Sequence, residues 1–167
     1  MRHRLQSIPW WGQCVLVWLA VLIVLTIVSL ITARTANALG ELSGGYFPQD
    51  VVPPDTIPGI WLRWDAFYYY RLAEEGYATN PDAMGFFPLY PLLMAGLSRV
   101  TGLSLDMSGM LISQASYLFA ILCFYKLARL IQDDHAYAMR CVLFLVLFPS
   151  SFFYFAVYAE SLSLGFS

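Results

Sequence analysis

Three long apolar segments dominate this sequence, and we place them at residues 13–33, 109–131 and 141–162. The hydrocarbon core of a bilayer is about 30 Å thick, a distance that about 20 helical residues cover. The composition agrees with membrane spans, because 59% of the residues are apolar and 12% are charged, whereas a soluble domain has about 25% charged residues. The sequence therefore predicts an all-α, polytopic transmembrane protein.

Basic residues beside these segments predict their orientation, because cytoplasmic loops are enriched in Lys and Arg. Arg2 and Arg4 precede the first segment, and further basic residues flank the connection between the second and the third. We therefore expect residues 1–12 and 132–140 in the cytoplasm and residues 34–108 in an extracytoplasmic loop. A cleaved signal peptide is the alternative for the first segment, but the apolar run exceeds the usual core of about 7 to 15 residues.

The extracytoplasmic loop carries helical signals of its own. Apolar spacing predicts one amphipathic helix near 61–75, ended by Gly76, and a second near 89–100, entered through Pro88. The second helix is too short to cross a bilayer. We expect both helices to lie on the membrane surface.

Polar residues within the apolar segments predict contacts between helices. Ser113 and Gln114, near the start of the second segment, would have to face other helices. Pro149 lies inside the third segment, where the missing backbone donor should kink the helix.

Metal ions and nucleic acid are not expected as partners. The nine Lys and Arg residues are scattered singly, so the basic stripe of a nucleic-acid-binding surface is missing. Cys14, Cys123 and Cys141 lie in or beside apolar runs without metal-binding spacing, and His3 and His135 stand alone. We therefore expect neither a metal nor a cofactor.

Asp65 is the candidate catalytic residue. In a helix over 61–75 it would share one face with Trp61, Trp64 and Tyr68. Partial desolvation among these rings would make the carboxylate a better base for an acceptor hydroxyl. Asp65 could also serve only as a helix N-cap.

Glu160 is a second candidate carboxylate. It lies at the outer end of the third apolar segment, so the expected topology places it on the same side of the membrane as Asp65. An ionisable residue at a membrane boundary is a functional hypothesis, although Glu160 could simply face water.

Three motifs in this order resemble the PIG-V type mannosyltransferases, which add the second mannose in GPI-anchor synthesis, and their prokaryotic relatives. They are WDAFYYYRLAEEGY from Trp64, FFPLYPLL from Phe86 and FPSSFFYFAVYAESL, which ends in the Tyr158–Leu162 stretch. Two positions depart from the family pattern: Ala159 replaces the usual Ser, and Arg63 stands where His is common.

The resemblance implies a GT-C type fold and an inverting transfer from a polyprenyl-phosphate sugar to a lipid or glycan acceptor. Asp65 would be the base, and Arg63, Arg71 and Arg99 are candidates for contacting the leaving phosphate. The implied substrate-binding residues are Arg63, Trp64, Tyr68, Tyr69, Arg71, Tyr77, Phe87, Pro88, Tyr158 and Glu160. The protein would lie in a bacterial plasma (inner) membrane with its site outside the cytoplasm.

Two other classes of protein remain alternatives. A transporter would use Asp65 and Glu160 as ion or proton sites, but its acidic groups are expected inside the spans. A noncatalytic assembly subunit would use the outer loop to bind a partner. Three spans enclose little volume, so we expect this chain to be the N-terminal piece of a longer protein.

Overall fold

The computed structural model describes residues 8–38, 56–79 and 85–167, with the exception of the Asn37 side chain. Every regular element within these residues is a helix, which confirms the predicted all-α class. The basic residues Arg2 and Arg4 lie outside the described residues, and so does the proline-rich stretch 39–55.

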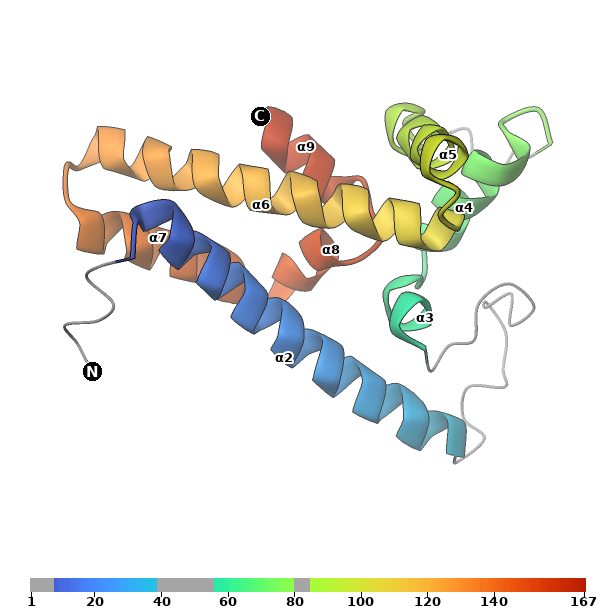
Figure 1. Cartoon of the computed structure of the whole chain (residues 1–167), viewed down its shortest axis with the longest axis horizontal. Helices are drawn as coiled ribbons and strands as arrows, with labels where there is room; N and C mark the ends of the chain where they lie inside the picture. The colour runs from blue at the N-terminus through green and yellow to red at the C-terminus, as the bar shows by residue number, and fades with distance from the viewer. Residues whose placement is uncertain (1–7, 39–55, 80–84) are drawn as a thin grey trace.

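Two long helices form the frame of the fold. Helix α2 spans Trp10–Ala38 and helix α6 spans Leu105–Ile131, and both are long and apolar enough to cross a membrane. Figure 1 shows them diverging toward the end at which α3, α4 and α5 lie. Large apolar side chains such as Ile23, Val24 and Ile31 are exposed along α2, as expected for a helix that faces lipid.

The third apolar segment is broken, not continuous. Helix α7 (His135–Leu147) is followed by the 3₁₀ turn η3 (Pro149–Ser151) and by α8 (Phe152–Phe155), and the two halves meet at 69°. The kink expected at Pro149 is therefore present. The preceding residue, Phe148, takes the extended backbone that proline favours in its neighbour.

The expected single helix over 141–162 is wrong at both ends. The Asp134 side chain accepts hydrogen bonds from the Ala136 and Tyr137 amides, and this cap starts the helix at His135. The chain then leaves helical conformation at Ala156 and resumes in α9 (Glu160–Phe166).

The amphipathic helix expected over 61–75 is also wrong as one element, because it is two helices. Helix α3 covers Ile57–Trp61 and helix α4 covers Ala66–Glu75. Between them Trp64 has a φ of 46°, a left-handed conformation that no right-handed helix can contain. Helices α3 and α4 therefore bury different residues from those that one continuous helix would bury.

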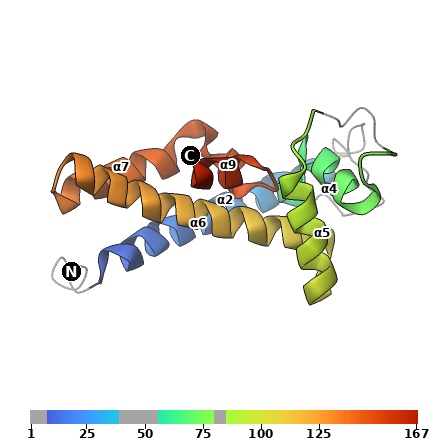
Figure 2. The same cartoon turned by 90° about the horizontal axis from the view of Figure 1, so that it is seen from above.

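Helix α5 spans Leu89–Thr101, close to the 89–100 expected from the sequence. Gly102 ends it with a φ of 73°, a backbone conformation that glycine adopts without steric cost. Figure 2 shows α5 lying across one end of α6, next to α4. This arrangement gathers the expected surface helices at the end of the molecule where the chain passes from Trp61 to Asp65.

Polar groups hold the broken segment against α6. Gln114 Nε2 donates to the Phe155 carbonyl at 2.6 Å, and Trp18 Nε1 of α2 donates to Gln114 Oε1 at 3.2 Å. Ser113 Oγ donates to the Tyr158 carbonyl at 3.1 Å. Both polar residues thus face neighbouring segments, as their position in an apolar helix required.

Candidate functional site

Asp65 lies at the N-terminal boundary of α4, directly after the left-handed Trp64. Its carbonyl accepts hydrogen bonds from the amides of Tyr68 at 3.0 Å and Tyr69 at 3.3 Å. The side chain makes no capping hydrogen bond, and the residue is exposed. The carboxylate is therefore available to another group, while the backbone starts the helix.

The expected aromatic enclosure of Asp65 is not present. Trp61 is only 3% exposed and points into the core, whereas Asp65 faces outward. Trp64 packs edge-on against Phe152 at 6.0 Å between ring centroids. The break between α3 and α4 rotates these residues away from the common face that a single helix would give them.

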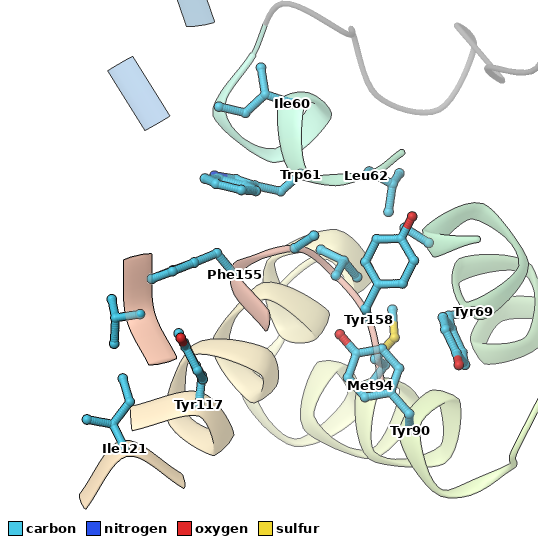
Figure 3. Packing of buried hydrophobic residues seen from close by; sticks show 14 of the residues in the cluster. Ile60, Trp61, Leu62, Tyr69, Tyr90, Met94, Tyr117, Ile121, Phe155 and Tyr158 are labelled. Carbon is cyan, nitrogen blue, oxygen red and sulfur yellow. The ribbon is translucent and has the colours of Figure 1, made fainter. Parts of the chain in front are cut away.

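The segment from Ala156 to Ala159 lies beside the Asp65 loop. The Val157 amide donates to the Trp61 carbonyl at 3.2 Å, and the Tyr158 hydroxyl donates to the Arg63 carbonyl at 2.8 Å. Figure 3 shows the Tyr158 ring with its hydroxyl directed toward Leu62. The residues just before the first motif are thereby joined to the third motif by one bond between backbone groups and one from a side chain.

Two carboxylates share the electrostatics of this region. Glu160 lies beyond the bent α7–α8 pair, and partial loss of hydration, with a smaller contribution from the Asp65 charge, raises its pKa. Burial and the charges of Glu160 and Asp65 raise the pKa of Tyr69 to about 12. Arg63 is half-buried, and the loss of hydration lowers its pKa. Tyr69 and the two carboxylates therefore act on one another electrostatically.

Other predicted substrate-binding residues make contacts within the loop. Arg71 pairs with Glu75 at 3.2 Å and lies 5.1 Å from the Phe67 ring centroid. The Tyr77 hydroxyl donates to the Phe86 carbonyl at 2.6 Å. These contacts order the loop on the side of α4, and nothing in the described residues brings Arg71 or Tyr77 into contact with Asp65.

The aromatic residues after Asp65 fall into an exposed and a buried set. Tyr68 is exposed and stacks on Phe86 at 5.0 Å, while Tyr69 is buried between Phe86 and Tyr90, at 5.0 Å from each ring. Phe87 and Pro88 are exposed, and so is Arg99, in the last turn of α5.

Sequence reasoning missed Tyr90, and it predicted for Ser113 a contact with other helices but no role in the site. Tyr90 is 1% exposed, and its hydroxyl lies 2.6 Å from Ser113 Oγ and 3.0 Å from the Gly109 carbonyl. Ser113 in turn holds the Tyr158 carbonyl. Ser113 can be recognised from the sequence as a polar residue in an apolar helix. Tyr90 lies among many other aromatic residues, so nothing in the sequence distinguishes it.

Two apolar cavities are lined in part by residues of the Tyr158–Glu160 stretch. The first has a volume of about 610 Å³, extends along α2 and includes Arg63, Trp64 and Tyr158 in its lining. The second, of about 580 Å³, is lined by Glu160, Tyr90 and Phe87 among others. The first cavity combines a hydrocarbon wall with a cation, which suits an amphipathic molecule with an anionic head.

The described residues contain no group of three or more His, Cys, Asp or Glu side chains that is placed to hold a metal ion. The site therefore offers carboxylates, a guanidinium and aromatic rings. Such a set can take a proton from a hydroxyl and bind an anion.

Comparison with known proteins gives two positive findings. The sequence model of a family described as Mannosyltransferase (PIG-V) matches residues 13–167. A curated relative, GPI mannosyltransferase 2 of Drosophila pseudoobscura pseudoobscura, is 26% identical over 138 residues, which cover 77% of this chain and 30% of the relative. The chain thus spans about 30% of the length of that relative. No solved structure matches the chain.

Proposed function

The chain belongs to the PIG-V mannosyltransferase family, and on this basis we propose that it transfers mannose from a polyprenyl-phosphate donor to an acceptor hydroxyl. The observation that carries the proposal is the exposed Asp65 carboxylate, which makes no capping hydrogen bond and directly follows Arg63 and Trp64, two residues that line an apolar cavity. A base, a cation and a hydrocarbon-lined volume are the three features that a lipid-phosphate sugar donor requires.

In this reaction Asp65 takes the proton of the acceptor hydroxyl as its oxygen attacks the anomeric carbon. A new bond forms between that oxygen and the anomeric carbon, while the bond from the carbon to the phosphate oxygen breaks. Polyprenyl phosphate leaves from the opposite face of the sugar with the bonding electrons. The configuration at the anomeric carbon is therefore inverted.

The cavity along α2 supports a lipid donor. Leu25, Val28 and Ile60 contribute hydrocarbon to its wall, and Arg63 adds a positive charge. Because hydration of Arg63 is partly lost, its interaction with a phosphate is stronger than it would be in water. We assign the prenyl chain to this cavity and the phosphate to its Arg63 end.

The distribution of charge supports an extracytoplasmic site. Arg129 and Arg140 lie at the end of the fold where α6 leads into α7, whereas Asp65 lies near the start of α6. If the basic end is cytoplasmic, the carboxylates face the opposite side. This orientation agrees with the topology expected from the sequence.

Transfer of radiolabelled mannose from polyprenyl-phosphate-mannose to membrane acceptors tests the proposal, using membranes that contain the full-length protein. We expect Asp65→Asn to lower the rate by about 100-fold or more, as removal of a general base does. Glu74→Gln is the matched control, because Glu74 is an exposed carboxylate on the same helix, and it should retain the rate. Analysis of the anomeric configuration of the product tests inversion.

Two outcomes would contradict the proposal. Full activity of Asp65→Asn at equal expression would remove Asp65 from the base position. An active protein that used a nucleotide sugar but not the polyprenyl-phosphate sugar would exclude the lipid donor and the role assigned to the α2 cavity.

A further inference from the structure

We infer that Tyr158 is a positioning residue, whose phenol holds the Arg63–Asp65 turn in the conformation that presents the Asp65 carboxylate. The inference rests on the proposed function for its kinetic consequences, and on the structure alone for the clamp itself. It replaces the direct substrate contact that the sequence suggested for Tyr158.

The turn before Asp65 needs a restraint. Trp64 has a φ of 46° and is the one non-glycine residue with positive φ in the described part of the chain. Bulky L-residues rarely adopt this conformation, which persists only where the surroundings impose it. The direction of the Asp65 side chain depends on this residue, because α4 begins immediately after it.

The Tyr158 phenol restrains the turn at the residue directly before Trp64. Its hydroxyl donates to the Arg63 carbonyl at 2.8 Å. The Val157 amide adds a bond of 3.2 Å to the Trp61 carbonyl. One short segment therefore fixes the loop at two points, the carbonyls of Trp61 and Arg63.

Tyr158 is itself held by α6 and α8. Ser113 Oγ of α6 donates to the Tyr158 carbonyl at 3.1 Å. The Phe153 ring packs on Tyr158 at 5.6 Å between centroids. The position of the phenol is thus set by two helices.

This geometry distinguishes positioning from substrate contact. Tyr158 is 2% exposed, and its hydroxyl donates to the Arg63 carbonyl. The single proton of the phenol is therefore already used in a backbone hydrogen bond. The influence of Tyr158 on the reaction passes through Asp65.

Kinetics of Tyr158→Phe test the inference in full-length protein, with the mannosyl transfer assay. We expect kcat to fall by about 10-fold or more, because a small misplacement of a catalytic group is costly, while KM for the donor stays within twofold. In an Asp65→Asn background, Tyr158→Phe should cause no further loss. Additive losses in the double variant, or a rise in KM alone, would overturn the inference.

Two controls keep the test decisive. Tyr154→Phe removes a hydroxyl from the neighbouring helix α8 and should leave kcat unchanged. If Tyr158→Phe does not fold, Ser113→Ala weakens the same clamp from its other end and should show the same loss of kcat and the same absence of additivity with Asp65→Asn.

Hydrogen exchange separates this inference from the proposed function. The amides between Trp61 and Asp65 should exchange faster in Tyr158→Phe than in the wild type, while exchange in the interior of α6 stays the same. Unchanged exchange in the loop would overturn the clamp even in an active enzyme. Faster exchange in a protein that transfers no mannose would uphold the clamp and reject the proposed function.

Discussion

Single residues decide how closely the segments of the site approach one another, and Gly109 of α6 is the clearest case. A Cβ at this position would lie 2.7 Å from Val157 Cγ1 and 2.9 Å from Met94 Cε. Met94 can move because it is flexible, but Val157 is β-branched and belongs to the segment that carries Tyr158. The absence of a side chain at 109 therefore allows the site segment to rest on α6.

We predict that Gly109→Ala destabilises the protein by about 1–3 kcal/mol through overpacking. Thermal unfolding of the purified protein in detergent measures the change. The matched control is Gly96→Ala on α5, where a Cβ meets no atom within 4 Å. There the substitution should be neutral or stabilising by up to about 1 kcal/mol, because alanine is the better helix former.

The combination of Gly109→Ala with Val157→Ala checks the cause. If the clash with Val157 is responsible, the double variant should recover part of the stability that Gly109→Ala loses. Equal stability of Gly109→Ala and the wild type would show that the segment carrying Tyr158 can shift without cost.

Asp65 and Tyr158 also show which features of a single residue a sequence pattern does not predict. The Trp-Asp motif and the neighbouring aromatic residues predict that Asp65 belongs to the site, but they do not predict that Asp65 is exposed. The exposure of Asp65 depends on the φ of Trp64. A hydrophobic pattern indicates which residues share one face of a helix, but not where the helix breaks. The third motif likewise indicates Tyr158, but it does not predict the hydrogen bond from Tyr158 to the Arg63 carbonyl, 95 residues away in the chain.

At the scale of elements, the break between α7 and α8 matters most, because it leaves backbone carbonyls without helical partners. The side-chain amide of Gln114, in the first half of α6, donates a hydrogen bond to one of these groups, the Phe155 carbonyl, at 2.6 Å. Ser151 Oγ donates to the Val146 carbonyl at 2.7 Å. Polar side chains within apolar helices therefore stabilise the irregular backbone of the third segment.

We predict that Gln114→Leu destabilises the protein by about 1–3 kcal/mol, because the buried Phe155 carbonyl loses its donor. Thermal unfolding in detergent again gives the measurement. Trp18→Phe is the comparison, since it removes the 3.2 Å bond to Gln114 Oε1 and part of a half-buried ring, and should cost less. A larger loss for Trp18→Phe than for Gln114→Leu would contradict the assignment.

At the scale of the whole molecule, the carboxylates and the basic connection occupy opposite ends of α6. Asp65 and Glu160 lie toward its start, and the Arg129–Asp133 ion pair lies at its end. This polarity is what a membrane-spanning enzyme with a one-sided site requires. The expected orientation has the basic end in the cytoplasm.

Labelling of single cysteines in intact cells measures that orientation. In a background without Cys14, Cys123 and Cys141, we predict that a membrane-impermeant maleimide labels Thr79→Cys, which is exposed after α4. It should not label Gln132→Cys, which is exposed at the end of α6, until the cells are permeabilised. The reverse pattern would place Asp65 in the cytoplasm and contradict the proposed face.

The sequence by itself determined the helical class, the two long apolar helices and the family, because these depend on composition, length and motif order. It also located α5 and the proline break, since proline and glycine act on the backbone next to them. Only the tertiary structure decided that Trp64 has a left-handed backbone conformation, that Asp65 faces outward and that Tyr158 fixes the Arg63–Asp65 turn. Those features depend on hydrogen bonds and packing between segments distant in the chain, which no local pattern encodes.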